Sequence, residues 1–293
     1  MSVLVVGGTG FIGPHVVHAL RGRDENVRAL VRNPARATRL TAWGAELFPG
    51  DITDATSLRA ACEGVDTVIN LVSIIKGSRA QFERVMTMGT RALVAAAQDA
   101  GVRRFVLTSA LGLDETTKDA VPYYAAKWEM EKAVNESGLD SVIFRPSFVF
   151  GRDGGVLPTF ARLARFAPVT PIVGPGTQRI QPIWVEDLAQ YFAHAGSGDM
   201  TGTFEVGGPD AVTWNEFWDR LKVALGVKRP AIHMPFGVMR LQAAMTEKLP
   251  GAPVTRDQLK MLALGDNVVS DARAVETFQL PLMPLDEQLR RAA

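Results

Sequence analysis

The chain has 293 residues, enough for one large domain or for a domain with a smaller lobe. Hydrophobic residues make up 47% of it and charged residues 22%, as in soluble globular proteins. The 32 Lys and Arg balance the 31 Asp and Glu, and the net charge of +1 offers no electrostatic field for a nucleic acid or an anionic membrane.

The cysteine content and the absence of a targeting signal indicate in which cellular compartment the protein is expected. The single cysteine, Cys62, excludes an internal disulfide and indicates a reducing environment, where we expect it to be inert packing in a helix. The N-terminus has no basic leader, and no apolar run approaches the roughly 20 residues that span a bilayer. The sequence therefore predicts a cytoplasmic protein without a transmembrane segment.

The first predicted strand runs directly into a glycine-rich turn and then into an amphipathic helix. The glycines are Gly7, Gly8, Gly10 and Gly13. The first two would let the chain turn sharply, Gly10 would let the backbone approach a pyrophosphate, and Gly13 would let the helix pack closely. The phosphates would rest on the N-terminus of the helix, where N–H groups and the helix dipole attract an anion. We interpret this segment as a dinucleotide site; the alternative is a glycine-rich turn without a ligand.

Short apolar runs alternate with amphipathic stretches through the first half of the chain, which is typical of a parallel sheet wrapped by helices. The predicted strands are 3–6, 27–31, 45–48, 66–72, 103–108 and 141–145. The predicted helices lie near 12–22, 35–41, 55–62, 80–100 and 122–137. We therefore expect an α/β fold of the Rossmann type, a doubly wound parallel sheet with a smaller, irregular C-terminal substrate lobe.

The sequence pattern changes after Gly151. Prolines and glycines cluster there, and the alternation of apolar runs with amphipathic stretches is lost. We expect a dinucleotide-binding domain over 1–150, with 182–206 returning to it as a helix near 185–196 and a strand near 203–206. The smaller lobe, which would contact a substrate or a partner, comprises 151–181 and 207–293.

The end of the second strand selects the cofactor, because it lies near the adenosine ribose in a dinucleotide fold. An NAD site places an acid there, but this strand ends in Arg32 and is followed by Arg36, whereas Asp24 and Glu25 precede the strand. A guanidinium pairs well with a 2′-phosphate. The sequence thus favours NADP(H) over NAD(H); the alternative is that both arginines are solvated surface residues.

Asp51 follows the third strand, where an acid can accept a hydrogen bond from the adenine amino group. It could equally be the N-cap of the next helix, and so could Asp54. The sequence leaves both interpretations open.

Tyr123 and Lys127 lie at the start of the helix predicted over 122–137 and are four residues apart, so they share one helical face. A neighbouring ammonium and the positive nicotinamide ring both favour ionisation of a phenol whose ordinary pKa is about 10. The pair can exchange a proton with a carbonyl or hydroxyl group while a hydride moves to or from the cofactor. Such pairs are common on helix surfaces, but the position after the fifth strand favours a catalytic role.

Metal and acyl-transfer chemistry have no support in the sequence. His15 and His18 are one turn apart without a nearby Cys or clustered carboxylates, so we predict no metal site. The sequence also lacks the Gly-x-Ser-x-Gly turn that carries the nucleophile of many hydrolases, so it gives no support to an acyl-transfer hydrolase.

These features together resemble the extended branch of the short-chain dehydrogenase/reductase superfamily. The shared motifs are Gly7–Gly13, Gly50-Asp51-Ile52, Tyr123-x-x-x-Lys127, Arg145-Pro146-Ser147 with Phe150-Gly151, and the segment from Pro182 to Ala189. Within this epimerase-like branch the chain is similar, nearly end to end, to the atypical subgroup around the NADPH-binding accessory subunit of mitochondrial complex I and its bacterial relatives. The similarity to this subgroup is less specific than the superfamily motifs, and it lies in residues 68–72, 105–110, 151–153 and 181–182.

The resemblance implies a role for each matching residue. Thr9, Phe11 and Ile12 would contact the phosphates; Leu71, Val72 and Ser73 would line the ribose; Lys127 would bond the nicotinamide ribose; and Pro146 and Ser147 would edge the nicotinamide. With the residues discussed above, the candidate cofactor set is Gly7, Thr9, Gly10, Phe11, Ile12, Gly13, Arg32, Arg36, Asp51, Ile52, Leu71, Val72, Ser73, Lys127, Pro146 and Ser147.

The chain departs from the family at one catalytic position. The family has Ser or Thr at the end of the fifth strand to hold the substrate oxygen beside the tyrosine, and the aligned residue here is Ala110. Ser109, one position earlier, would point to the opposite face of the strand. Ser109 is our candidate third catalytic residue beside Tyr123 and Lys127, and the departure puts turnover in question.

Two main functions follow from the resemblance. The first is an NADP(H)-dependent oxidoreductase or isomerase acting on a small carbonyl, hydroxyl or quinone-like substrate. The alternative is a non-catalytic NADPH-binding structural or assembly protein, associated with respiratory complex I or quinone biosynthesis and peripheral to the membrane through a protein partner. A redox sensor of NADP(H) is the third. The Met- and Leu-rich segment 235–245 suits an adaptable partner surface or an apolar lid over the substrate.

Overall fold

The computed structural model describes residues 1–247 and 254–292, and the chain divides into two compact units. Unit 1 comprises Met1–Pro146, Val185–Val206 and Asp271–Leu280; unit 2 comprises Ser147–Trp184, Gly207–Ser270 and Pro281–Ala293. The predicted boundaries put all of 207–293 in the smaller lobe, whereas Asp271–Leu280 belongs to unit 1. The reason is Phe278, whose ring lies 5.5 Å from that of Phe144 and 5.2 Å from that of Tyr191, both in unit 1.

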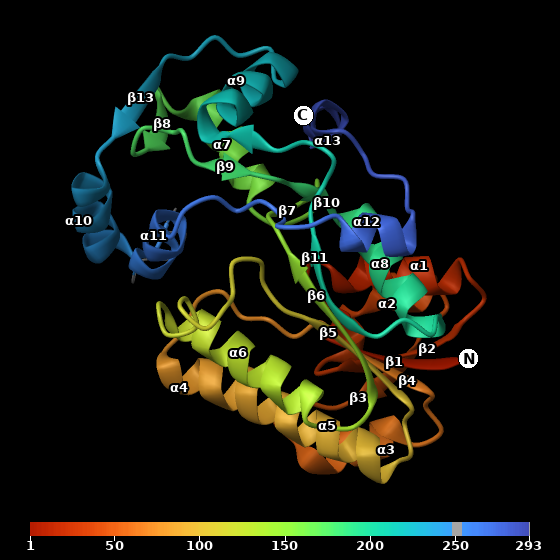
Figure 1. Ribbon diagram of the computed structural model, residues 1–293. Helices are drawn as coiled ribbons and strands as arrows, with labels where there is room; N and C mark the ends of the chain where they lie inside the picture. The colour runs from red at the N-terminus through yellow and green to blue at the C-terminus, as the bar shows by residue number, and fades with distance from the viewer. Residues whose placement is uncertain (248–253, 293) are drawn as a thin grey trace. The chain divides into compact units, whose positions relative to one another are not determined.

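Unit 1 is built on a seven-stranded sheet in the order β11-β6-β5-β4-β1-β2-β3, with every neighbouring pair parallel (Figure 1). Its strands are β1 (Ser2–Val6), β2 (Asn26–Val31), β3 (Glu46–Pro49), β4 (Thr67–Asn70), β5 (Arg104–Thr108), β6 (Asp140–Pro146) and β11 (Gly202–Val206). The strand order reverses between β1 and β4, which makes the predicted doubly wound sheet a confirmed feature of the fold.

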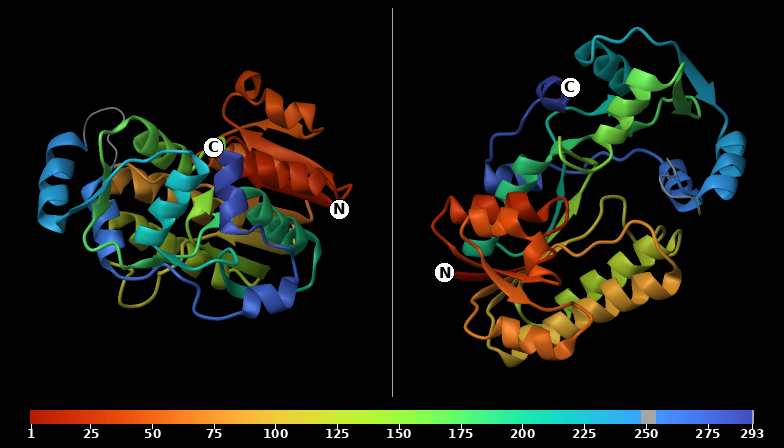
Figure 2. Two further views of the ribbon diagram at one scale, coloured as in Figure 1. Left: turned by 90° about the horizontal axis from the view of Figure 1, so that it is seen from above. Right: turned by 180° about the vertical axis from the view of Figure 1, so that it is seen from behind.

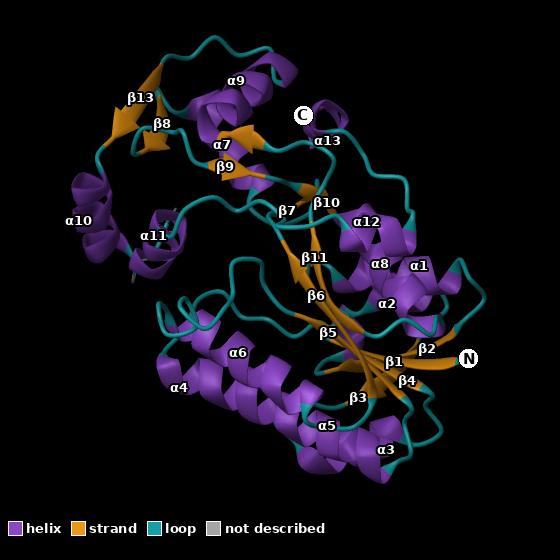
Figure 3. Ribbon diagram, in the orientation of Figure 1, coloured by secondary structure: helices purple, strands orange, loops and turns teal. Residues whose placement is uncertain are grey.

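Helices cover both faces of this sheet (Figure 3). One face carries α3 (Ala55–Cys62), α4 (Arg79–Phe82), the π-helical segment η2 (Glu83–Met88), α5 (Gly89–Asp99) and α6 (Pro122–Asn135). The other carries α1 (Gly13–Arg21), α8 (Val185–Ser197) and α12 (Arg273–Phe278). The short η1 (Pro34–Arg36) and α2 (Thr38–Ala42) connect β2 to β3.

Burial on both faces explains why the central strands read as continuous apolar runs. All four residues of β4 and all five of β5 are buried, and Val68, Phe105 and Leu107 share a hydrophobic core with Leu4, Met86 and Met130. Cys62 belongs to the same core, and burial raises the pKa of its thiol to about 11. The thiol is therefore protonated at neutral pH and packs as an apolar group.

Unit 2 combines short two-stranded sheets with helices around an aromatic core. Its strands are β7 (Val149–Phe150), β8 (Thr170–Val173), β9 (Arg179–Ile180), β10 (Ile183–Trp184), β12 (Val212–Thr213) and β13 (Ala231–Met234). Its helices, seen again in Figure 2, are α7 (Leu157–Phe166), α9 (Trp214–Ala224), α10 (Phe236–Thr246), α11 (Arg256–Ala263) and α13 (Leu285–Ala292). Phe160, Trp214, Phe217 and Trp218 stack edge to face or tilted at 5.2 to 5.6 Å.

Two properties of the described residues bear on function. Within 1–247 and 254–292, no helix has the length and apolar character needed to cross a bilayer. The same residues contain no group of three or more His, Cys, Asp or Glu side chains placed to hold a metal ion.

Candidate functional site

Most candidate site residues lie at one edge of the seven-stranded sheet. The glycine loop follows β1, Arg32 follows β2, Asp51 follows β3, Leu71 to Ser73 follow β4, and Ser109 follows β5. Since the strands are parallel, all of these segments leave the sheet at its carboxyl edge, on both sides of the switch point between β1 and β4. Ligands of open α/β sheets bind in this position.

The glycine loop can be built only with glycine at two of its positions. Gly7 has a φ of +89°, and a Cβ there would lie 3.0 Å from the backbone of Leu71 and Val72 at the end of β4. A Cβ on Gly13 would lie 2.5 Å from the backbone of Gly7 and Gly8. These contacts press the start of α1 against the β1 turn.

The surface of this loop suits a pyrophosphate. Thr9 and Gly10 are exposed, Phe11 and Ile12 are half-buried, and a Cβ on Gly10 would meet only the Gly7 carbonyl, at 3.2 Å. The N-terminus of α1 has no side-chain cap and no acidic residue in its first turn. Its N–H groups and dipole are therefore directed to a space where an anion is favoured.

Arg32 is exposed directly after β2, and Arg36 is exposed at the end of η1. The acids Asp24 and Glu25 lie before the strand, and Glu25 forms an ion pair of 3.1 Å with the amino group of Met1. The carboxyl end of β2 thus presents a guanidinium where an NAD-preferring site would present a carboxylate.

The structure separates the two roles that the sequence left open for Asp51. Asp54 is the N-cap of α3 and accepts hydrogen bonds from the N–H groups of Thr56 and Ser57. Asp51 instead accepts from the N–H and hydroxyl of Thr53, at 2.8 and 2.7 Å. Burial alone would raise the pKa of Asp51, but the Thr53 hydrogen bonds and the charges of Arg32 and Arg84 lower it overall.

Ile52 is the buried member of this segment. Its side chain packs against Gly89 at the start of α5, where a Cβ would lie 3.0 Å from Ile52. The Ile52 side chain is thus part of the hydrophobic core of unit 1.

The turn after β4 lies against the glycine loop and near the tyrosine. The Leu71 N–H donates to the Val6 carbonyl at 2.8 Å, and the Val72 N–H donates to Asn70 Oδ1 at 3.0 Å. Ser73 is exposed, and its hydroxyl lies 3.5 Å from the hydroxyl of Tyr123. The structure therefore brings the predicted ribose-lining and catalytic residues together.

Lys127 is fully buried at the centre of the candidate site. Its Nζ donates a 2.7 Å hydrogen bond to the Thr108 carbonyl and lies 5.8 Å from the centre of the Tyr123 ring. Burial lowers the pKa of Lys127 to about 7, although the negative charge of Glu131 raises it. At neutral pH this side chain can take up or release a proton.

Tyr123 is held between two elements by its ring and its hydroxyl. The ring packs edge to face on Phe82 of α4 with centroids 6.3 Å apart. Burial raises the pKa of Tyr123 above its ordinary value, and the hydrogen bond from Ser73 opposes this rise. The phenol is thus protonated at neutral pH and can act as an acid.

Ser109 follows Thr108, whose carbonyl accepts the Lys127 hydrogen bond, and is buried, with 3% of its surface exposed. Its N–H donates to the Phe144 carbonyl at 2.6 Å, while its hydroxyl has no hydrogen-bond partner within the described chain. Ala110 is buried as well. An unpaired buried hydroxyl is costly unless a ligand or water completes it, but ten other buried side-chain atoms of the described residues share this state, so the catalytic role of Ser109 stays a prediction.

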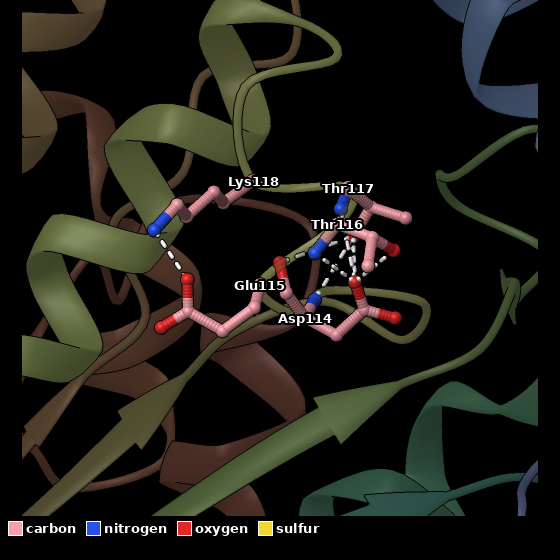
Figure 4. A network of polar contacts seen from close by, with 5 residues as sticks. All are labelled: Asp114, Glu115, Thr116, Thr117 and Lys118. Atoms are coloured by element: carbon pink, nitrogen blue, oxygen red, sulfur yellow. Dashed lines mark hydrogen bonds and ion pairs between the residues drawn. The ribbon is translucent and has the colours of Figure 1, made fainter.

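The Asp114 carboxylate is the centre of a hydrogen-bond network in the loop between β5 and α6 (Figure 4). One oxygen of Asp114 accepts from the N–H groups of Thr116 and Thr117, at 2.7 and 2.9 Å, and from the Thr116 hydroxyl. Lys118 pairs with Glu115 beside it. The Tyr124 hydroxyl ties the start of the loop to α6 by donating to the Leu111 carbonyl at 3.2 Å. These contacts hold the loop that leads into α6, which begins at Pro122.

Two candidate residues meet the unit boundary. Pro146 ends β6 in unit 1, opposite Val206 of β11. Ser147 opens unit 2, where its hydroxyl lies 2.7 Å from Asn267 Oδ1 and 3.1 Å from the Asn267 carbonyl. The structure gives Ser147 a partner within its own unit.

The sequence analysis missed two buried polar residues. Asn70 bonds the Val72 N–H and the Thr90 hydroxyl, at 3.0 Å each, and so shapes the turn after β4. Glu131, one helical turn beyond Lys127, carries a buried ion pair. The Lys127–Glu131 spacing was the available signal for the second.

The chain is similar in sequence to families and proteins that are already known. The family model described as NAD(P)H-binding matches residues 7–159, and the model of the RmlD substrate binding domain matches 112–261. A ceramide reductase of Caulobacter vibrioides is 30% identical over 80% of this chain and 73% of its own length. Subunit 9 of the NADH dehydrogenase [ubiquinone] 1 alpha subcomplex of Rattus norvegicus is 28% identical over 98% of this chain and 79% of its own.

One solved structure illustrates the fold. The NADPH-dependent quinone oxidoreductase QOR2 of Escherichia coli, complexed with NADPH, has a TM-score of 0.79 and 21% identity, covering 98% of each chain. The family match and the glycine cradle together support a nicotinamide dinucleotide as the cofactor. The chain belongs to the NAD(P)H-binding proteins of the extended short-chain dehydrogenase/reductase superfamily.

Proposed function

We propose that the chain is an NADPH-dependent oxidoreductase that reduces a carbonyl or quinone-like substrate. The observation that carries the proposal is the placement of Tyr123 and Lys127. A phenol and a buried lysine share one face of α6 beside the turns after β4 and β5. The names of the ceramide reductase and the quinone oxidoreductase support a reductase with a carbonyl-type substrate.

The bound cofactor would supply a hydride to the carbonyl carbon. Tyr123 Oη would give its proton to the carbonyl oxygen, so that the C=O group becomes an alcohol. The raised pKa of Tyr123 keeps that proton in place at neutral pH before the reaction. The Lys127 ammonium would stabilise the phenolate that remains, because an opposite charge nearby favours the ionised form.

Ser109 and Ser73 are the candidate groups for orienting the substrate oxygen. Ser73 already bonds the Tyr123 hydroxyl, and the buried Ser109 hydroxyl has no partner in the described chain. Ala110 has no donor, so the orienting role that the family assigns to its aligned serine would pass to one of these two. The Ser109 hydroxyl needs a ligand or a water to complete its hydrogen bonding.

The preference for NADPH is part of the proposal. Arg32 and Arg36 are exposed at the carboxyl end of β2 and could form charge-assisted hydrogen bonds to a 2′-phosphate. The remaining candidates from the sequence, Thr9 to Gly13 and Leu71 to Ser73, would hold the pyrophosphate and the ribose.

Transfer of a labelled hydride tests the proposal. NADPH deuterated at C4 would be incubated with the protein and a panel of aldehydes, ketones and quinones, and the products examined by mass spectrometry. We expect deuterium in one of the reduced products. Binding of NADPH without transfer to any member of the panel would contradict the enzymatic role.

A second candidate function is that of a cofactor-binding assembly protein. Its supporting observation is α10, where Leu241 and Met245 are 66% and 74% exposed on one helical face. The rat complex I subunit is a relative over nearly the whole chain. If this role holds, Leu241→Gln with Met245→Gln would abolish comigration with complex I on native gels of the source cells while NADPH binding stays intact.

A further inference from the structure

Three titratable residues recur at four-residue intervals along α6: Tyr123, Lys127 and Glu131. At this spacing they lie on one face of the helix, each one turn from the next. Glu131 is buried, with 4% of its surface exposed, and Lys127 is completely buried. Two oppositely charged groups therefore lie one turn apart in the interior of unit 1.

Arg145 of β6 holds the Glu131 carboxylate from the side of the sheet. Its Nε donates to Oε1 at 2.9 Å and its terminal nitrogen to Oε2 at 2.6 Å, so both carboxylate oxygens are engaged. This fork geometry is the strongest that a guanidinium makes with a carboxylate. It gives the buried Glu131 carboxylate the opposite charge and the hydrogen bonds that a buried carboxylate requires.

The other charged groups around α6 interact with residues other than Lys127. Asp114 of the preceding loop and Glu205, which faces Arg145 on β11, act on Arg145. On the exposed side of the helix, Glu129 pairs with Arg91 of α5 at 2.5 Å. Burial lowers the pKa of Lys127, and the charge that raises it is that of Glu131.

We propose that Glu131 is a positioning residue that keeps the Lys127 ammonium charged beside Tyr123, and that Arg145 fixes the Glu131 carboxylate for this purpose. The inference rests on the proposed function, in which that ammonium stabilises the Tyr123 phenolate. Glu131 would touch neither substrate nor cofactor. Its effect would pass through the protonation state of Lys127.

The chain allows a direct titration of Lys127, because it has only eight lysines. The protein would be labelled with ¹³C at the lysine ε carbon, whose chemical shift reports the charge of the amine. The Lys127 signal would be assigned by its loss in Lys127→Arg. The titration midpoint would then be compared in wild type, Glu131→Gln and Glu129→Gln.

We expect Glu131→Gln to lower the Lys127 midpoint by about one pH unit, because a nearby negative charge is lost. Glu129→Gln removes an exposed carboxylate from the same helix and should leave the midpoint in place. An unchanged midpoint in Glu131→Gln would overturn the proposal, since a purely structural ion pair would not move it.

Glu131→Gln leaves Arg145 unpaired and could unfold the chain. The double variant Glu131→Gln with Arg145→Met removes both charges, and we expect its Lys127 midpoint to stay below that of wild type. A return to the wild-type midpoint would assign the effect to Arg145 and overturn the role of Glu131. The titration needs neither cofactor nor substrate, so its result is independent of whether the deuterium experiment detects turnover.

Discussion

The ammonium group of Lys127 is anchored to Thr108, whose carbonyl at the end of β5 accepts its hydrogen bond at 2.7 Å. This bond joins α6 to the carboxyl edge of the sheet. It places a fully buried lysine next to Tyr123, with no exposed surface through which water could stabilise the charge. The consequences of that burial can be measured.

The first prediction concerns the pH dependence of stability. The pKa of Lys127 falls from 10.5 in the unfolded chain to about 7 in the folded one. Between these values the unfolded chain binds the additional proton, so the free energy of unfolding rises with pH. We expect wild type to gain up to about 1.4 kcal/mol per pH unit over this window relative to Lys127→Met.

Chemical denaturation at several pH values measures this difference. Lys132→Met changes an exposed lysine on the same helix and serves as the control, with a stability curve parallel to that of wild type. If the curve of Lys127→Met were also parallel, Lys127 would not change its pKa on folding.

The second prediction separates the two tyrosines at the start of α6. Tyr123→Phe removes the proposed acid and should slow hydride transfer by roughly 10²–10⁴-fold, with NADPH affinity unchanged. Tyr124→Phe removes only the hydrogen bond to the Leu111 carbonyl, so it should cost about 1 kcal/mol of stability and leave the rate near that of wild type. Single-turnover kinetics decide between them; equal rates in both variants would assign the proton to another group.

The third prediction concerns cofactor choice. Arg32→Ala should weaken NADPH binding by about 1.5–3 kcal/mol through loss of a charge-assisted phosphate contact, and should leave NADH binding unchanged. Arg59→Ala, which removes an exposed arginine of α3, is the matched control. Calorimetric titration of wild type and both variants with NADPH and with NADH measures these affinities. A preference for NADH in wild type would refute the assignment of Arg32.

The fourth prediction compares two glycines of the same loop. Gly10→Val should abolish cofactor binding with the fold retained, because the added methyls occupy the space of the pyrophosphate while the Cβ meets only one carbonyl, at 3.2 Å. Gly13→Val should disrupt folding, because its Cβ would lie 2.5 Å from the Gly7–Gly8 backbone. Circular dichroism and NADPH titration distinguish the two. Retained affinity in a folded Gly10→Val protein would place the phosphates elsewhere.

Sequence patterns predicted the strands of unit 1 to within a few residues because both faces of the sheet are buried. The departures arise from side-chain hydrogen bonds that a pattern does not show. The strand predicted over 66–72 ends at Asn70, whose side chain bonds the Val72 N–H and turns the chain. In place of the single helix predicted over 35–41, the structure has the short η1, which Asn33 caps, and then α2.

The candidate site residues that directly follow a strand could be predicted from the sequence. Parallel strands bring their carboxyl ends together, so the glycine loop, Arg32 and Asp51 could be assigned to one edge from the sequence. The choice of Asp54 over Asp51 as the helix cap required hydrogen-bond geometry. The Glu131–Arg145 pair joins positions on α6 and β6 whose contact depends on how the helix is rotated against the sheet.

A crystal structure of the complex with NADP⁺ would show whether the nicotinamide reaches Tyr123 and Lys127. We expect the 2′-phosphate at Arg32, the pyrophosphate on the N-terminus of α1, and the nicotinamide C4 facing the Tyr123 hydroxyl with Lys127 at the adjacent ribose. A nicotinamide ring directed away from Tyr123, or a side chain filling the space beside that hydroxyl, would contradict it.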